Sequence, residues 1–368
     1  MFPAMNSIHD LPTPALLLDL DILEANLRGM ADRCRDLGVR LRPHVKTHKC
    51  VEIGLGQREL GAAGITVSTL FEARVFADAG FEDITWAFPI VNSRVTEAVE
   101  LAERIRFGVT IDSPEAVDLL QSTGRPFRVW LKVDAGYGRA GVTIDTDEAL
   151  QLADRIAAAP ELEFAGLLSH SGNAYHATSP AQVERIAHEE RDALSALAER
   201  IRARGTEVPG LSGGSTPSMS KARDLSGMTE VRPGNYALYD WTQVALQSCS
   251  LDQCAATILA SIVSSHSDSR RSVVDAGALA LSADPGPAHL PGAGMGVLLD
   301  PDRPGHILQN ARMRTLSQEH GIVDGTLPVG DRVRIVPNHS CLAVACFDAF
   351  FVTRGEEVLD RWTIHRGR

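Results

Sequence analysis

Long apolar segments are missing from this chain of 368 residues. No run approaches the roughly 20 apolar residues that a helix needs to cross a bilayer. The first residues, MFPAMNSIHD, contain neither the basic stretch nor the apolar stretch of a secretory signal. We therefore expect no membrane partner and a cytoplasmic location.

The chain also has fewer basic than acidic side chains. It contains 36 Lys and Arg and 47 Asp and Glu, so its formal net charge is −11. A protein that grips nucleic acid or anionic lipid needs a basic excess, so we expect no nucleic-acid partner. Six cysteines are too few for a disulfide scaffold in so long a chain, and reduced thiols are expected. The hydrophobic share of 44% is that of a globular protein and excludes disordered and collagen-like chains.

The first part of the chain alternates strand-like runs, rich in Val, Ile and Phe, with helix-like stretches. The predicted strands are 41–46, 65–69, 84–88, 107–111, 129–134, 164–170, 209–212 and 230–232. A (β/α)₈ TIM-like barrel requires this alternation. A doubly wound open sheet would share it and is the competing topology.

The helical stretches have apolar stripes and recognisable ends. Ser179 and Pro180 supply an N-cap and a first-turn proline, and Gly205 ends that helix. Its apolar side chains recur at i, i+3, i+4 and i+7, which predicts one buried face: Leu194, Leu197, Ala198 and Ile201. An earlier stripe predicts a second helix: Leu23, Leu27, Met30, Ala31 and Cys34.

After about residue 247 the pattern changes to strands joined by turns. The predicted strands are 256–264, 271–276, 331–336, 343–353 and 358–364, with a hairpin turn at 354–357. The chain is thus predicted to hold a barrel over 21–247 and a C-terminal all-β domain over 248–368. A strand at 15–20, within the first 20 residues, is expected to join the second domain.

A lysine at the end of the first predicted strand is the first candidate for chemistry. The strand ends in RPHVKTHK, residues 42–49, and a period of two puts His44 and Lys46 on one side. Barrel enzymes carry their reactive groups where strands end at the C-terminal face. A lysine desolvated there is a candidate for Schiff-base chemistry, and the alternative is a solvated or salt-bridged lysine.

A phosphate-binding loop is the second candidate. The segment LSGGSTP, residues 211–217, has glycines, hydroxyls and the start of a helix, and RPGNY at 232–236 could complete the cradle. A flexible turn is the alternative. A lysine that reacts with carbonyls and a phosphate cup together suggest pyridoxal 5′-phosphate (PLP).

Two further loops offer polar groups near the barrel mouth. DAGYGRAG at 134–141 presents Arg139, which could be a fixed cation beside a phenolate or carboxylate or simply a surface arginine. SHSGNAY at 169–175 presents His170 and Tyr175 as hydrogen-bonding groups, and a core histidine is the alternative for His170.

In the β domain, PNHSC at 337–341 places His339 and Cys341 on one side of an extended segment. Both side chains suit zinc, and two protein ligands would leave positions for water and substrate, as in a catalytic site. Coincidence is the alternative. A second polar cluster, SQEHG at 317–321, contains Glu319 and His320, to which we assign no role.

These segments, in this order, resemble the D-serine dehydratase / D-threonine aldolase family: RPHVKTHK, SGGSTP, RPGNY and PNHSC. The resemblance covers nearly the whole chain. It implies the alanine-racemase-like fold, called fold type III among PLP enzymes, and a homodimer. It also implies that Lys46 carries PLP and that His339 and Cys341 hold a divalent metal, zinc or another such as Mn²⁺. By the same resemblance, the phosphate would be lined by Gly214, Ser215, Thr216, Asn235 and Tyr236, and the ring and substrate by Arg139, His170 and Tyr175.

The metal pair separates the chemistries within this family. Its aldolases resemble His-x-Asp at this place and its dehydratases His-x-Cys, and this chain has Cys341. We therefore expect a dehydratase that converts a D-3-hydroxy amino acid, such as D-serine or D-threo-3-hydroxyaspartate, to a 2-keto acid and ammonia. A D-threonine aldolase giving glycine and an aldehyde is the alternative, and a racemase is the third. A non-catalytic PLP-binding protein and a sugar- or phosphate-binding barrel without PLP are the candidates from other classes.

Overall fold

The computed structural model describes residues 6–292, 294–300, 303 and 305–368. It divides into two compact units. The barrel unit comprises residues 30–46, 53–234 and 367–368. The β unit comprises the described part of residues 1–29, 47–52 and 235–366. The boundaries predicted at 21–247 and 248–368 stay a prediction, and residues 1–5 of the expected N-terminal segment lie outside the described residues.

Eight parallel strands form the sheet of the barrel unit, in the spatial order β2-β10-β9-β8-β6-β5-β4-β3. A bridge between His44 and Thr66 joins the two ends of this order, so the sheet closes into a barrel. A short strand, β7 (Val142–Thr143), pairs beside β6. The eight are β2 (Arg40–Leu41), β3 (Ile65–Val67), β4 (Asp83–Pro89), β5 (Arg106–Ile111), β6 (Phe127–Asp134), β8 (Leu162–Leu168), β9 (Leu211–Gly213) and β10 (Glu230–Val231). The predicted barrel is confirmed and the open sheet is wrong.

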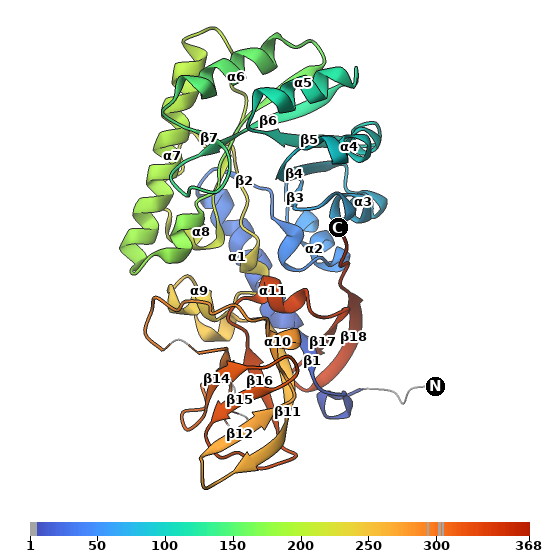
Figure 1. Ribbon diagram of the computed structural model, residues 1–368, viewed down its shortest axis with the longest axis vertical. Coiled ribbons are helices and arrows are strands. Elements are labelled where there is room, and N and C mark those ends of the chain that lie inside the picture. The colour runs from blue at the N-terminus through green and yellow to red at the C-terminus, as the bar shows by residue number, and fades with distance from the viewer. Residues whose placement is uncertain (1–5, 293, 301–302, 304) are drawn as a thin grey trace. The chain divides into compact units, whose positions relative to one another are not determined.

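Helices alternate with these strands and lie on the outside of the sheet (Figure 1). They are α1 (Leu20–Asp36), α2 (Val51–Glu59), α3 (Leu70–Asp78), α4 (Val95–Ala102), α5 (Pro114–Ser122), α6 (Asp147–Ala158), α7 (Pro180–Arg202) and α8 (Thr216–Lys221). Helix α7 begins as predicted, since the Ser179 side chain accepts from the Gln182 backbone N–H. The side chains of both predicted stripes are buried. Burial of its apolar face holds α7 against the barrel unit, where it contacts β9.

The β unit is built on a second, mostly antiparallel sheet in the order β14-β15-β12-β11-β1-β17-β18, with β16 beside β11 and β13 beside β16. Its strands are β1 (Ala15–Asp19), β11 (Ala256–His266), β12 (Arg271–Val274), β13 (Val297–Leu298), β14 (Arg312–Leu316), β15 (Gly321–Asp324), β16 (Arg332–Val336), β17 (Ala349–Arg354) and β18 (Glu357–Thr363). Its helices are short: α9 (Trp241–Ala245), α10 (Ala278–Leu281) and α11 (Ser340–Val344).

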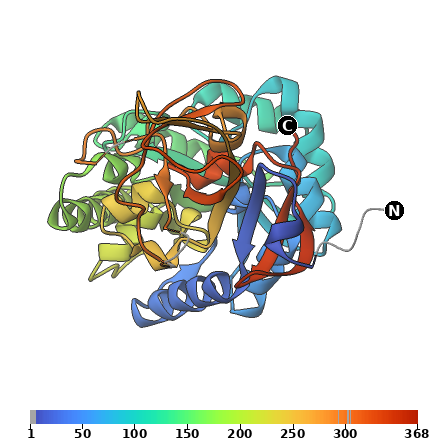
Figure 2. The same cartoon turned by 90° about the horizontal axis from the view of Figure 1, so that it is seen from below.

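The expected early strand is β1, which pairs antiparallel with β11 and parallel with β17. Figure 2 shows β1, in blue, beside the red strands of the C-terminal hairpin. That hairpin forms where it was predicted, with Arg354 opposite Glu357 and Gly355 at φ +61°. Glycine populates this region without the steric cost that a Cβ carries.

Two predicted strands are partly wrong. The run at 343–353 begins within helix α11, and strand β17 starts only at Ala349. The strand at 41–46 ends at Leu41, and Lys46 lies in a 3-10 turn formed by Val45–Thr47. Pro43 has no N–H to give to a ladder, which explains the early end. Alternation along a strand is therefore not what orients Lys46.

Candidate active-site groups in the two units

Lys46 lies in the turn that follows β2 and is half-buried. On the same segment, His44 Nε2 is 3.4 Å from Ser68 Oγ. Lys46 is close enough to act electrostatically on His170, which follows β8. The structure thus brings two of the predicted residues together at the ends of barrel strands, where reactive groups of barrel enzymes collect.

His170 is surrounded by cations. Burial is the largest cause that lowers its pKa well below the usual value, and the charges of Lys46 and Arg139 lower it further. Two more cations contribute, Lys132 and Arg232. The His170 ring is therefore neutral at physiological pH and can donate one hydrogen bond and accept another.

Arg139 and His170 meet through an aromatic ring that sequence reasoning missed. The Tyr137 and His170 ring centroids are 5.8 Å apart in an edge-to-face arrangement, and the Arg139 guanidinium lies 5.0 Å from the Tyr137 ring centroid. A Cβ on Gly172 would overlap the Tyr137 ring. The glycine lets the ring pack onto the loop, and Tyr175 follows in the 3-10 turn Gly172–His176.

Lys132 is a second residue that sequence reasoning missed. It lies on β6 with 5% of its surface exposed. Burial lowers the pKa of its amine to about 7, and the positive charges of Arg232 and Arg139 contribute. A buried amine that is half neutral near pH 7 is unusual and occurs chiefly at functional sites. The signal in the sequence was a lysine between the apolar residues Leu131 and Val133 of a predicted strand.

The predicted phosphate loop is a buried cluster of hydroxyls. Ser171 Oγ lies 3.2 Å from Ser215 Oγ and 3.1 Å from Ser218 Oγ, and all three side chains are buried. Ser215 and Ser218 also form a capping box at the start of α8, which begins with Thr216. The loop is therefore fixed by its own hydrogen bonds before any ligand binds.

Gly214 behaves differently from the expectation for a phosphate-binding glycine. It has φ +82°, but its backbone N–H donates to Glu190 Oε2 over 2.9 Å. Glu190, on α7, is buried and also accepts from Ser169 Oγ. This N–H is therefore used within the protein, and the hydroxyls of the loop are the groups left to contact a ligand.

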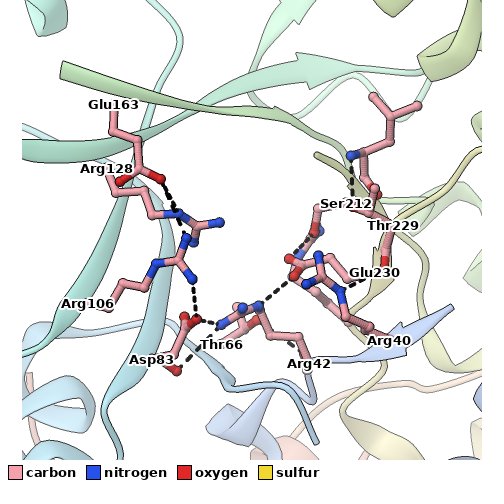
Figure 3. A network of polar contacts seen from close by, with 12 residues as sticks. Arg40, Arg42, Thr66, Asp83, Arg106, Arg128, Glu163, Ser212, Thr229 and Glu230 are labelled. Atoms are coloured by element: carbon pink, nitrogen blue, oxygen red, sulfur yellow. Dashed lines mark hydrogen bonds and ion pairs between the residues drawn. The ribbon is translucent and has the colours of Figure 1, made fainter. Parts of the chain in front are cut away.

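Arg232 connects this loop to a chain of buried charges inside the barrel unit. Its guanidinium donates to Ser212 Oγ and to the Ser169 carbonyl. Ser212 Oγ donates to Glu230 Oε1 over 2.8 Å. Arg42 then bridges Glu230 and Asp83, at 2.8 Å and 2.6 Å (Figure 3). Each buried charge in this chain has an opposite charge or a hydrogen bond, as stability requires.

The β unit contains the predicted metal pair. His339 and Cys341 flank the start of α11, and Cys341 Sγ lies 3.2 Å from Thr47 Oγ1. On the other side, His339 Nδ1 lies 3.1 Å from Asp284 Oδ2. Burial lowers the pKa of His339, but Cys341 and Asp284 raise it more strongly, and the resulting value is about 11. The pocket thus favours a positive charge at the imidazole.

Asn235 belongs to this cluster too. Its Nδ2 donates to Asp240 Oδ2 at 2.6 Å and to Ser340 Oγ at 2.9 Å, and it lies 3.9 Å from Cys341 Sγ. Its Oδ1 is buried and has no hydrogen-bond partner among the described residues. Since the unsatisfied atom is an acceptor, it suits a cation or a donor rather than a phosphate. Tyr236, its neighbour, is fully buried.

The donor sets of the two units fit the two implied groups. Imidazole, thiolate and an unsatisfied amide oxygen suit a divalent metal, and thiolate favours zinc. In the described part of the chain, no group of three or more His, Cys, Asp or Glu side chains is arranged to hold a metal. The cations around His170 and the serine cluster suit an anionic cofactor such as PLP.

The second polar cluster lies in a turn whose backbone carbonyls, those of Ser317 and Gln318, accept hydrogen bonds from the start of α10. Glu319 and His320 are exposed in the turn between β14 and β15. In addition, none of the described helices has the length and apolarity needed to cross a membrane.

Comparison with known proteins identifies the chain. An alanine racemase N-terminal domain model matches residues 18–240, and a serine dehydratase domain model matches residues 255–353. The chain is 35% identical to D-threo-3-hydroxyaspartate dehydratase of Delftia sp. (strain HT23), over 97% of this chain and 98% of the relative. It belongs to the D-serine dehydratase / D-threonine aldolase family. Members of this family are PLP-dependent lyases, and so is this chain.

The relatives of this chain include both dehydratases and aldolases. D-serine dehydratase of Dictyostelium discoideum is 34% identical over 95% of each chain. D-threonine aldolase of Arthrobacter sp. is 29% identical over 96% of this chain and 92% of the relative. Family membership therefore establishes the lyase class and leaves the bond that is broken to a proposal.

Solved structures agree with the fold. The Delftia dehydratase superposes with a TM-score of 0.94 at 33% identity, covering 99% of this chain and all of the other. D-threonine aldolase from Filomicrobium marinum gives 0.86 at 31% identity, covering 99% and 98%. Alanine racemase of Clostridium difficile 630 gives 0.69 at 13% identity, covering 96% and 99%, which shows the shared fold alone. The predicted alanine-racemase-like architecture is confirmed.

Proposed function

We propose that this lyase is a PLP- and zinc-dependent dehydratase of D-3-hydroxy amino acids such as D-serine or D-threo-3-hydroxyaspartate. The products would be a 2-keto acid and ammonia. The observation that carries this proposal is the pairing of a thiol with an imidazole at His339 and Cys341. Imidazole and thiolate select zinc over ions such as Mn²⁺, which prefer oxygen ligands.

In the barrel unit, Lys46 is proposed to carry the cofactor. When bound, PLP withdraws electrons from the substrate α-carbon and makes the α-proton acidic. The Lys46 amine, once released, would take that proton on Nζ. Neutral His170 and the Arg139 guanidinium, both in contact with the Tyr137 ring, would orient the ring and the substrate, and Tyr175 is assigned to the same role on the family resemblance. The phosphate is assigned to Ser215 and its neighbours Gly214 and Thr216. The family resemblance adds Asn235 and Tyr236, but both belong to the β unit, and the buried Asn235 Oδ1 suits a cation instead.

In the β unit, His339 and Cys341 would hold the metal. Zinc, when bound, supplies Lewis-acid stabilisation to a leaving hydroxyl. A solved metal-free form of a D-threo-3-hydroxyaspartate dehydratase carries a cysteine-to-alanine replacement, and another solved mutant of such a dehydratase replaces a histidine two positions earlier. The same spacing separates His339 from Cys341 and supports the assignment of this pair. A homodimer is proposed on the family resemblance. A cytoplasmic location is proposed on the low cysteine content, which favours reduced thiols.

A product assay tests the proposal. Purified protein loaded with PLP and zinc is supplied with D-serine, D-threo-3-hydroxyaspartate and D-threonine, with and without exhaustive chelation. We expect keto acid and ammonia from at least one of the first two, and loss of this turnover on chelation. Glycine and an aldehyde would identify an aldolase instead, and full turnover after chelation would remove the metal from the proposal.

A further inference from the structure

A carboxylate that no motif in the sequence pointed to faces the metal pair of the β unit. Asp284 Oδ2 lies 3.1 Å from His339 Nδ1, although 55 positions separate the two residues. A histidine has only two ring nitrogens, so Nε2 is the one left for a metal. The carboxylate therefore decides which nitrogen of His339 is available.

Asp284 is held in place by several other hydrogen bonds. Its Oδ1 accepts from the Gly286 N–H over 2.7 Å, and its own N–H donates to Ser282 Oγ over 3.3 Å. Its carbonyl accepts from Asn338 Nδ2 over 3.1 Å. With both carboxylate oxygens and the backbone engaged, the side chain is oriented before any metal binds.

Asn338, the residue before His339, holds the loop of Asp284 to the metal segment. Its Nδ2 also donates to the Gly294 carbonyl over 2.7 Å. Gly286 has φ +60°, and a Cβ there would lie 2.7 Å from the Asn338 side chain. The loop and the metal segment are therefore closely packed, with no room for a larger residue at Gly286.

The contact between Asp284 and His339 is not an ordinary ion pair of the protein surface. Among the residues that the structure describes, His339 is the basic side chain within ion-pair distance, and no Lys or Arg pairs with this carboxylate. Both side chains are mostly buried, with 26% of Asp284 and 33% of His339 exposed. Histidines that bind metals commonly donate their second ring N–H to a carboxylate, which fixes the tautomer and the ring orientation.

We propose that Asp284 is a positioning residue: by accepting the Nδ1–H of His339 it directs Nε2 toward the metal and strengthens metal binding. The inference rests on the proposed function, since it requires that His339 and Cys341 hold a metal. Asp284 itself does not touch the metal or the substrate in this assignment.

Zinc titration of PLP-loaded protein, freed of metal by dialysis, tests the inference. We expect Asp284→Ala to weaken zinc binding about 10- to 100-fold, as removal of such partners does elsewhere. Asp284→Asn should lose less, because the amide oxygen still accepts from Nδ1. The matched control is Asp324→Asn, which alters an exposed carboxylate paired with Arg314 in the same unit and should leave zinc affinity unchanged.

Thermal unfolding separates positioning from a merely structural role. A positioning role leaves the Tm of the metal-free protein near the native value and reduces the rise that zinc produces. A fall in the metal-free Tm with an undiminished zinc-induced rise would overturn the inference. If Asp284→Ala does not fold, Asp284→Asn decides, with a several-fold loss of zinc affinity expected.

The outcome also distinguishes the two proposals. If native protein binds zinc and Asp284→Ala binds it equally well, the inference about Asp284 is wrong and the proposed function stands. If native protein binds no zinc, both fail. The absorbance of bound PLP, followed in the same samples, should be the same in all variants because Asp284 belongs to the β unit.

Discussion

The two candidate sites shift the pKa values of their histidines in opposite directions. In the barrel unit, burial and neighbouring cations lower the pKa values of His170 and Lys132, the latter to about 7. In the β unit, Cys341 and Asp284 outweigh burial and raise the pKa of His339 to about 11. One site is therefore positively charged and resists further protons, and the other attracts positive charge.

This difference matches the two groups that the units are proposed to bind. PLP brings a phosphate and a phenolate, and the cations of the barrel unit complement both. A divalent metal replaces the proton that an imidazole beside a thiolate would otherwise hold. The cations around His170 thus complement an anionic cofactor, and the carboxylate and thiol beside His339 favour a cation.

Removal of Lys46 should have the largest effect, because it should abolish the function of the barrel site and leave the site of the β unit intact. Lys46→Ala should abolish the absorbance band of lysine-bound PLP at about 410–420 nm. Activity should fall by at least about 10³-fold, because the proposed proton acceptor is lost. The zinc affinity of the β unit should stay native. Absorbance spectra, the product assay and a zinc titration check these expectations.

Lys221→Ala is the control for this change, since Lys221 lies in the last turn of α8 and has no assigned role. It should keep both the band and the activity. An intact band in Lys46→Ala would show that another amine carries the cofactor, and the assignment of the barrel site would be wrong.

Removal of Cys341 should have the opposite selectivity: it should abolish metal binding in the β unit and leave PLP binding intact. Cys341→Ala should spare the PLP band and lower turnover by about 10²–10³-fold, because Lewis-acid assistance is worth several kcal/mol. Bound zinc, measured after gel filtration, should be lost. Cys346→Ala changes a second partly exposed thiol of the same unit and should retain zinc and turnover. Native turnover in Cys341→Ala would refute the role of the metal pair.

The strand pattern of the barrel could be predicted because buried parallel strands appear as short apolar runs. Each of the eight predicted runs overlaps a strand of the barrel, and helix α7 begins at the predicted cap. The error at 41–46 shows the limit of such patterns, since one proline ended the strand before the residue of interest. The sequence predicted Lys46 in the correct segment, but the predicted orientation of its side chain assumed a strand that ends before it.

Contacts between residues far apart in the chain could not be predicted from the sequence. Asp284 meets His339 across 55 positions, and Arg42 meets Glu230 across 188. Neither carboxylate belongs to a short motif, and only the folded chain brings the partners together. Lys132 could have been predicted, because burying a lysine between apolar residues of a strand is costly unless it has a charged partner or a function.

A third prediction tests whether the buried charges of the barrel unit are independent of the β unit. Glu230 is 1% exposed at its side chain and pairs with Arg42 over 2.8 Å. Burial raises its pKa, but Arg42 and Ser212 lower it more, so the net shift is downward. Glu230→Gln leaves Arg42 underpaired and should cost about 3–5 kcal/mol in the free energy of unfolding.

Urea denaturation measures this loss, and zinc affinity should not change. Glu163→Gln, at a carboxylate that is 62% exposed, is the control and should cost no more than about 0.5 kcal/mol. The stabilisation from Glu230 is present above the unfolded pKa of about 4.3 and is lost as the pH falls through the lower folded value. Equal losses in the two variants would mean that burial of this network contributes little.

The smallest expected effect concerns Lys132, whose folded pKa of about 7 lies below its unfolded value. Between the two values the unfolded chain binds more protons, so this residue makes native stability rise with pH. Lys132→Met removes that contribution. The free energy of unfolding of the native protein relative to Lys132→Met should therefore increase by about 2 kcal/mol between pH 7 and 9. Urea denaturation across this range checks the slope, with Lys221→Met as a control that should follow the native curve. A parallel course of native protein and Lys132→Met would mean that the amine stays charged in the barrel, and the contrast between the two units would then rest on His170 and His339 alone.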